Sequence, residues 1–227
     1  MTLGDCLARH VADRLPDATH LRIAVAAANA QSTSAVRRTI LNVLAGGGYA
    51  VESGRLRRRP IAHRSWTLKL DGRRYTFAAA PMGELVAAFH STRIANIVVG
   101  RPMSANAARG LRTLSPLIQF ALSLSPLRRA LGGGSSASST KAEPVDGFRS
   151  WIWAEAQNAS GEQRAARIET GEGYAVTAAA AVVNVEALLS QKLAGAFTPA
   201  SAFGAAHVLK IPGVRLFDLE GGTMLGV

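Results

Sequence analysis

The chain has 227 residues, and 26 Lys and Arg against 15 Asp and Glu give a formal net charge of +11. Its single cysteine, Cys6, excludes an internal disulfide framework and fits a reducing, cytoplasmic location. No window reaches the roughly 18 uninterrupted apolar residues of a membrane span. The charge alone would favour binding to nucleic acid. Only four of the basic residues are lysine, however, and neither a zinc-finger spacing nor an aromatic–basic RNA signature accompanies them. We therefore expect no nucleic-acid partner, whereas weak association with an anionic membrane surface is compatible with the charge.

The first half of the chain predicts helices and strands in alternation. A helical spacing of apolar residues runs from Leu3 to Leu15, and a buried strand follows at Leu21–Ala28. Ser32, Thr33 or Ser34 can cap the next helix, which ends at the glycines 46–48. The remaining expected elements are two extended pieces around Ser53-Gly54, a hairpin of Ser65–Leu70 and Tyr75–Ala80 around Asp71-Gly72, a helix at Pro81–His90 and a strand at Ile94–Gly100.

The second half begins with two helical pieces within Ala105–Leu131, broken at Pro116 and Pro126. Gly132–Gly147 is rich in Gly and Ser and predicts a flexible loop. Two strands, Phe148–Gln157 and Glu162–Thr170, precede an alanine-rich helix at Tyr174–Leu189, which is expected to be buried. Thr198-Pro199 predicts the cap of a short helix, and Val214–Leu219 a last strand.

This order favours an α+β fold: one domain over residues 1–227, with a mixed, largely antiparallel sheet covered by helices on one face. Neither GxGxxG nor GxxxxGK[ST] occurs, so a complete Rossmann domain is not expected. The five histidines lack metal-ligand spacing, and no metal site is predicted. These residues alone do not identify a reaction that the protein could catalyse.

Several segments, in order along the chain, carry a resemblance to a known family. They are GDCLARHVADRLPDATHLRIAVA, STSAVRRTILNVLAGGGYAVESGRLRRRP, FHSTRIANIVVG, GEGYAVTAAAAVVNVEALL and GAFTPASAFG. Together they resemble the C-terminal portion of the saccharopine dehydrogenase-like oxidoreductases, a family that includes trans-acting enoyl reductases. In the family these segments follow a dinucleotide-binding half with a glycine-rich fingerprint, which this chain lacks. We therefore expect no NAD(P) binding by this chain alone.

The resemblance implies the substrate-binding and dimerisation portion of an NAD(P)-dependent enzyme, which transfers hydride to a C=C, C=N or C=O bond of a small molecule. Residues 196–227 would then return toward the nucleotide-binding half. The alternative is a stand-alone, non-catalytic module that dimerises or binds an apolar ligand.

The candidate site residues follow from this resemblance, and each has a simpler explanation. Thr198 and Ser201 would face the interdomain cleft near the cofactor; the simpler alternative is that Thr198 only caps a short helix. Ser32, Thr33 and Ser34 would bind substrate through their hydroxyls, or serve as caps. Tyr174 would donate a proton, or lie in the core. The arginines between Arg55 and Arg59 would grip a cofactor phosphate, or lie in a solvated loop.

Overall fold

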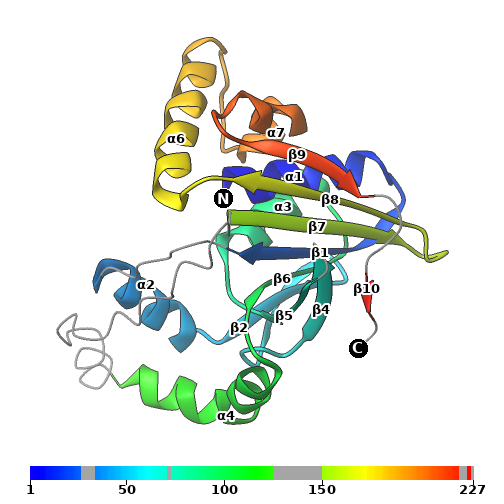
Figure 1. Cartoon of the computed structure of the whole chain (residues 1–227). Coiled ribbons are helices and arrows are strands. Elements are labelled where there is room, and N and C mark those ends of the chain that lie inside the picture. Colours follow the sequence, from blue (N-terminus) through cyan, green and yellow to red (C-terminus); the bar gives the residue numbers. More distant parts are fainter. Residues whose placement is uncertain (27–33, 71–72, 125–149, 220–223, 226–227) are drawn as a thin grey trace.

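A computed structural model describes residues 1–26, 34–70, 73–124, 150–219 and 224–225 (Figure 1). The helices are α1 (Thr2–Asp13), α2 (Ser34–Ala45), α3 (Gly83–Thr92), α4 (Ala105–Ser123), α6 (Gly173–Leu189), α7 (Pro199–Phe203) and the 3₁₀ helix η1 (Ala205–Lys210). The strands are β1 (Ala18–Ala26), β2 (Gly48–Glu52), β3 (Arg55–Arg59), β4 (Ser65–Leu70), β5 (Arg73–Ala79), β6 (Asn96–Pro102), β7 (Ser150–Asn158), β8 (Gln163–Thr170), β9 (Arg215–Leu219) and β10 (Met224–Leu225).

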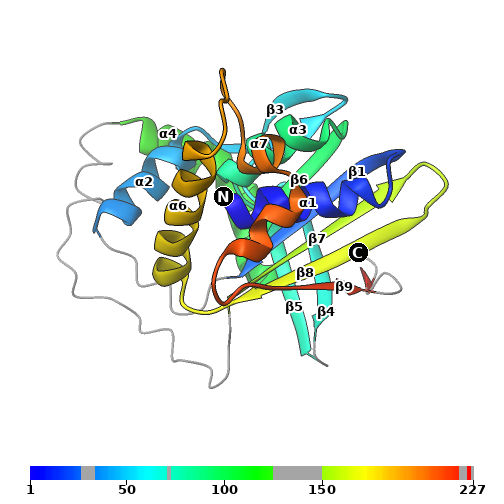
Figure 2. The ribbon, with the colours of Figure 1, turned by 90° about the horizontal axis from the view of Figure 1, so that it is seen from above.

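The strands form one mixed sheet, in the order β10-β4-β5-β6-β1-β7-β8-β9, with the β2–β3 hairpin attached to β6 beside β5. β1 and β6 are parallel, and the other pairs are antiparallel. Figure 2 shows α1, α3, α6 and α7 on one side of this sheet. The predicted α+β architecture, with helices on one face of a largely antiparallel sheet, is confirmed.

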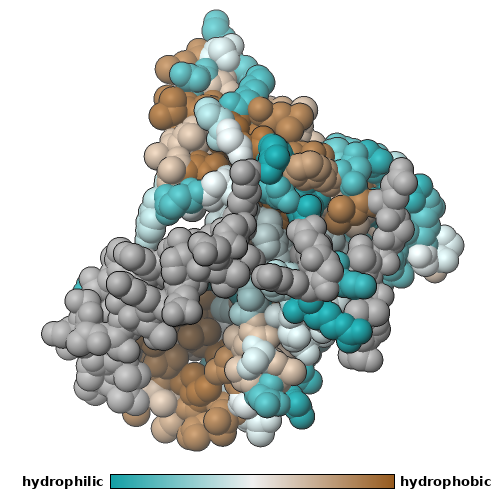
Figure 3. Space-filling model, viewed as in Figure 1, coloured by the Kyte–Doolittle hydropathy of each residue, from teal (hydrophilic) through white to brown (hydrophobic). Residues whose placement is uncertain are grey.

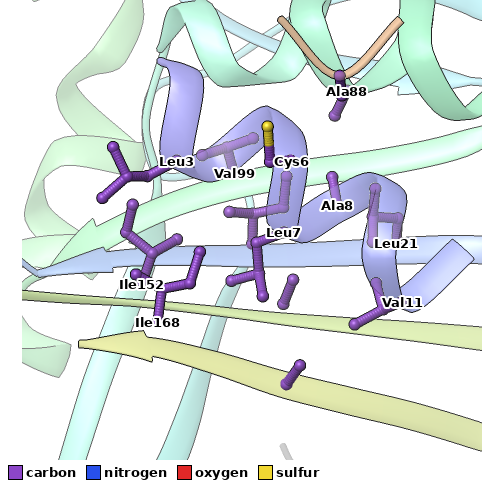
Figure 4. Close-up of a cluster of buried hydrophobic side chains, with 14 of the residues drawn as sticks. Leu3, Cys6, Leu7, Ala8, Val11, Leu21, Ala88, Val99, Ile152 and Ile168 are labelled. Carbon is purple, nitrogen blue, oxygen red and sulfur yellow. The ribbon is translucent and has the colours of Figure 1, made fainter. Parts of the chain in front are cut away.

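Helix α1 supplies the main contact between the two layers. Leu3, Leu7 and Val11 recur every four residues, so they share one face of the helix, and all are buried against the sheet. Their neighbours include Ile152 of β7 and Ile168 of β8 (Figure 4). The core therefore lies between α1 and the central strands.

The sheet curls strongly away from the helices. β9 and β10 lie at opposite ends of the strand order, although only four residues separate Leu219 from Met224. Eight strands laid flat would span about 34 Å, whereas five Cα–Cα steps reach at most about 19 Å. The two edges must therefore approach each other. The rings of Phe77 on β5 and Trp151 on β7, three strands apart, accordingly have centroids 5.4 Å from each other.

The concave face of the curled sheet carries an aromatic cluster of Trp66, Phe77, Trp151 and Trp153, all buried. Its close packing depends on small residues opposite the rings. A Cβ atom at Gly100 of β6 would lie 2.4 Å from Cη2 of Trp66, so only glycine fits without movement there. This cluster fills one end of the concave face.

Three predictions about elements need correction. α4 continues through Pro116 because proline removes only one helical hydrogen bond, while the buried Ser115 hydroxyl accepts bonds from Ile61 N at 2.7 Å and Gln119 Nε2 at 2.8 Å. α6 is largely exposed rather than buried. Arg55–Arg59 form the exposed strand β3, as the extended piece after Ser53-Gly54 predicts, so the solvated-loop alternative for these arginines is wrong. The predicted loop 132–147 and Pro126 lie outside the described residues.

Candidate ligand-binding site

Thr198 and Ser201 form the capping box of α7. The Thr198 hydroxyl accepts from Ser201 N at 3.3 Å, and the Ser201 hydroxyl accepts from Thr198 N at 2.8 Å. Helix α7 is held on α1, because Ala200 N donates to the buried carboxylate of Asp5 at 2.7 Å. The predicted cap by Thr198 is therefore confirmed, and Ser201 completes it, while the interdomain-cleft hypothesis remains a prediction.

The other sequence-derived candidates are dispersed. Tyr174 lies at the start of α6 with 56% of its surface exposed, so its alternative as a core aromatic is wrong. Ser34 is the first residue of α2, whereas Ser32 and Thr33 lie outside the described residues. In the C-terminal segment, β9 pairs with β8, and β10 pairs with β4.

A cavity of about 380 Å³ opens on the concave side of the sheet, beyond the aromatic cluster. Strands β1, β2 and β6 form its walls, together with the turn between β3 and β4 and the end of β7. Its polar lining residues come from all of these segments: His20, Arg22, Glu52, Ser53, His63, Arg64, Asn96 and Gln157. We call this the concave-face cavity.

The strand register explains why polar residues gather there. Along β1 and β7 the cross-strand pairs on this face are His20–Gln157, Arg22–Glu155, Ala24–Trp153 and Ala26–Trp151. Alternate residues of a strand share a face, so these pairs form successive layers. The layers pass from polar, through charged, to apolar. The cavity occupies the polar end, and the aromatic cluster closes the other.

Arg22 and Glu155 form an ion pair at the boundary between these layers. Arg22 Nη2 donates to Glu155 Oε1. The Glu155 side chain is fully buried, while 19% of the Arg22 side chain is exposed, and Arg22 lines the cavity. Burial raises the pKa of Glu155, and the charge and hydrogen bond of Arg22 oppose this rise. Glu155 Oε2 has no hydrogen-bond partner among the described residues, so this carboxyl can hold a proton.

His63 and Arg64 enter the cavity from the turn between β3 and β4. Burial lowers the pKa of His63, and the nearby Arg64 charge lowers it further, which favours a neutral imidazole. Among the described lining residues the acid is Glu52. It is bound by both Nε (2.8 Å) and Nη2 of Arg59, and these contacts hold the Glu52 pKa below its usual range. The acidic charges at the cavity are therefore already matched by Arg59 and Arg22.

Asn96 stiffens the wall between β1 and β2. Its amide donates to the Thr19 carbonyl at 3.0 Å and accepts from Ser53 N at 3.2 Å. The side chain therefore holds the end of β1 against the β2–β3 turn, where Ser53 and Gly54 both have positive φ angles. The arrangement preforms a concave, polar site.

The cavity can bind a polar molecule, and its cationic groups favour a negative charge on that molecule. Among the described residues, no group of three or more His, Cys, Asp or Glu side chains could hold a metal ion. Cys6 is buried in α1, and burial, with the neighbouring Asp5 charge, raises its pKa to about 12, so it is a poor nucleophile.

None of the sequence-derived candidates within the described part of the chain lines the concave-face cavity. One signal was available: Arg22 and Glu155 interrupt two otherwise apolar strands, LRIAVA and WIWAEA. Buried charges are normally paired, so two opposite charges in separate buried strands indicate that the strands are neighbours and that the two side chains form an ion pair. Which residues face each other, however, follows from strand pairing.

No model of a known protein family matches the chain, and no curated protein matches it. None of the described helices has the length and apolar content to cross a bilayer.

Proposed function

We propose that this chain is the substrate-binding part of an NAD(P)-dependent oxidoreductase similar to the saccharopine dehydrogenase-like proteins, and that a nucleotide-binding half outside residues 1–227 completes it. The proposal rests on the order of the family-like segments and on one structural observation: a preformed polar cavity on the open face of the sheet, with Arg22, Arg64 and His63 in its lining. In such an enzyme this part would hold the substrate, and the nucleotide-binding half would bring the nicotinamide to it.

The two faces of the sheet have different functions in this proposal. Helices α1, α3 and α7 pack on one face and stabilise the fold. The concave-face cavity lies on the other, where a ligand can enter. The hydride acceptor would be a C=C, C=N or C=O bond, and the cofactor would be NAD(P) bound elsewhere.

A stand-alone interaction module is the second candidate, and the exposed apolar residues of two helices favour it. On α6, Val182, Val185 and Leu189 are more than half exposed, as are Leu117 and Phe120 on α4. Figure 3 shows apolar surface over α6 and at the end of the molecule near α2 and α4. Apolar surface of this kind often contacts another protein.

The deciding experiment is to sequence the gene upstream of the Met1 codon and to express the longest in-frame product. We expect the added residues to include a strand, a GxGxxG-like loop and a helix, and the product to oxidise NAD(P)H with an enoyl or carbonyl substrate. A stop codon close upstream, or no oxidation with any such substrate, would favour the interaction module instead.

A further inference from the structure

The charge balance of the concave-face cavity restricts the class of ligand that it can bind. Its lining includes the permanently charged Arg22 and Arg64. The acid among its described lining residues, Glu52, is held by Arg59. The Arg64 charge also helps to lower the pKa of Glu52, but among the described residues no carboxylate forms an ion pair with Arg64. The cavity thus carries surplus positive charge.

Arg22 has donors that its bond to Glu155 does not use. A guanidinium has five N–H donors in a planar fork, and among the described contacts the bond to Glu155 takes one of them, from Nη2. Glu155 stands opposite Arg22 on β7 and is fully buried, whereas 19% of the Arg22 side chain is exposed and Arg22 lines the cavity. A preorganised arginine loses little further entropy when a ligand binds.

The surroundings favour a small anion over a macromolecule. A cavity of about 380 Å³ accommodates a compact ligand, near the lower end of the range of small-molecule sites. The buried aromatic cluster occupies the far end of the concave face, so an extended polymer ligand could not continue along the face in that direction. The net charge of +11 would raise the encounter rate with any anion.

We propose that the concave-face cavity binds a small organic anion through a carboxylate or phosphate group, held between the guanidinium groups of Arg22 and Arg64. Planar oxyanions match the arginine fork, and charge-assisted bonds of this kind are among the strongest hydrogen bonds in proteins. The identification of this anion as the substrate rests on the proposed function, whereas anion binding itself does not.

The test measures binding of succinate and inorganic phosphate to this chain by calorimetry, and the rise in Tm that each produces, at constant ionic strength set with chloride. We expect at least one of the two to bind and to raise the Tm. Arg64→Gln should weaken that binding about tenfold, because one charge-assisted contact is lost. Binding of succinate alone identifies a carboxylate ligand, and binding of phosphate alone a phosphorylated one.

Arg109→Gln is the matched control, since it removes the same charge from an exposed site on α4 whose hydrogen bonds are to its own helix. It should change binding less than about twofold, because screened surface charge acts weakly at this distance. Arg64 is exposed, so its variant should fold; Arg22→Lys adds a second variant that keeps the charge beside Glu155 but lacks the fork. Equal weakening by Arg64→Gln and Arg109→Gln, or no binding beyond that of chloride, would overturn the proposal.

The two proposals fail separately. Anion binding without NAD(P)H oxidation by the longest gene product would refute the oxidoreductase function and leave the anion site in place. Oxidation without anion binding, and unaffected by Arg64→Gln, would refute the anion site alone.

Discussion

At the level of single residues, the Arg22–Glu155 pair affects both the stability of the sheet and the cavity, because Arg22 lines the cavity and Glu155 is buried in the sheet. A buried ion pair contributes little net stability, because removing both charges from water costs about as much as their attraction returns. Losing one partner is different, since the remaining charge stays buried without compensation. The fully buried Glu155 makes this pair a sensitive point of the concave face.

Arg22→Gln should lower the free energy of unfolding by about 3 kcal/mol at neutral pH. The pKa of Glu155 is already raised by burial, and removal of Arg22 raises it further because two opposing contributions vanish. A raised carboxyl pKa means that the native state gains protons more readily, so the contribution of Glu155 to stability is present at low pH and is lost as the pH rises through the folded-state pKa. The loss of unfolding free energy in the variant, relative to the wild type, should therefore shrink as the pH falls toward about 4.3, the ordinary pKa of glutamate.

Urea unfolding of the wild type and of Arg22→Gln across this pH range measures the effect. The double variant Arg22→Gln/Glu155→Gln is the control, because it removes the buried carboxyl and should be more stable than Arg22→Gln at neutral pH. A deficit that stays constant with pH would show that Glu155 does not titrate against Arg22.

Gly100→Ala should destabilise the protein by roughly 1–3 kcal/mol through overpacking. The added methyl would lie 2.4 Å from Trp66 Cη2 and 2.8 Å from the Ala78 carbonyl oxygen, so either the indole or the strand must move. Gly110→Ala is the matched control, since nothing lies within 4 Å of a Cβ there and alanine favours helix α4. Denaturant midpoints should fall for the first variant and not for the second; equal midpoints would mean that Trp66 moves at little cost.

At the level of elements, local patterns predicted where helices and strands occur. The helical spacing of Leu7, Val11 and Leu15 predicted α1, and the Ser53-Gly54 turn predicted the β2–β3 hairpin; both are confirmed. The exceptions have a common cause, which is tertiary context. Pro116 predicts a break, but the Ser115 hydroxyl binds the chain at Ile61 and holds α4 in place. The apolar composition of α6 predicts burial, yet the described elements cover one side of it.

The candidate site was less predictable because it depends on register rather than on local pattern. Arg22 belongs to β1, Glu155 to β7 and His63 to a turn, and long intervals of sequence separate them. A shift of one residue in the β1–β7 pairing would move Arg22 to the helix-covered face and dismantle the site. Thr198 was predictable as a cap, since the signals for a helix start lie within a few neighbouring residues.

Thr198→Ala tests whether that cap has only a structural function. The loss of the capping box should cost about 1 kcal/mol of unfolding free energy, and Thr198→Ser, which retains the hydroxyl, should restore most of it. Thermal or urea unfolding measures both variants. If the complete enzyme shows unchanged cofactor affinity and turnover with Thr198→Val, the interdomain-cleft hypothesis for Thr198 is wrong.

At the level of the whole molecule, the positive charge and the apolar surface are separated. The chain carries a net charge of +11, but α6 contains no Lys or Arg and only one acid, Glu186. Its outer residues Val182, Val185 and Leu189 are 57%, 54% and 84% exposed. Two copies of this chain repel each other through their net charge, and α6 is a surface on which they could meet with little of that repulsion.

This separation predicts how self-association responds to salt. If copies associate through α6, added NaCl should strengthen association, because it screens the repulsion between cationic molecules and leaves the apolar contact intact. Complexes with nucleic acid behave in the opposite way, since salt weakens them steeply. Sedimentation velocity at several protein and NaCl concentrations distinguishes the two.

Val185→Glu should weaken this association about tenfold, because a carboxylate would be buried in an apolar contact. Ala159→Glu adds the same charge in the exposed turn between β7 and β8, at the opposite end of β8 from α6 (Figure 1), and should leave association almost unchanged. The pair therefore separates the chemistry of the α6 surface from the change in net charge. Association that weakens as NaCl rises, or that falls equally in both variants, would mean that charge and not the apolar surface of α6 brings the copies together.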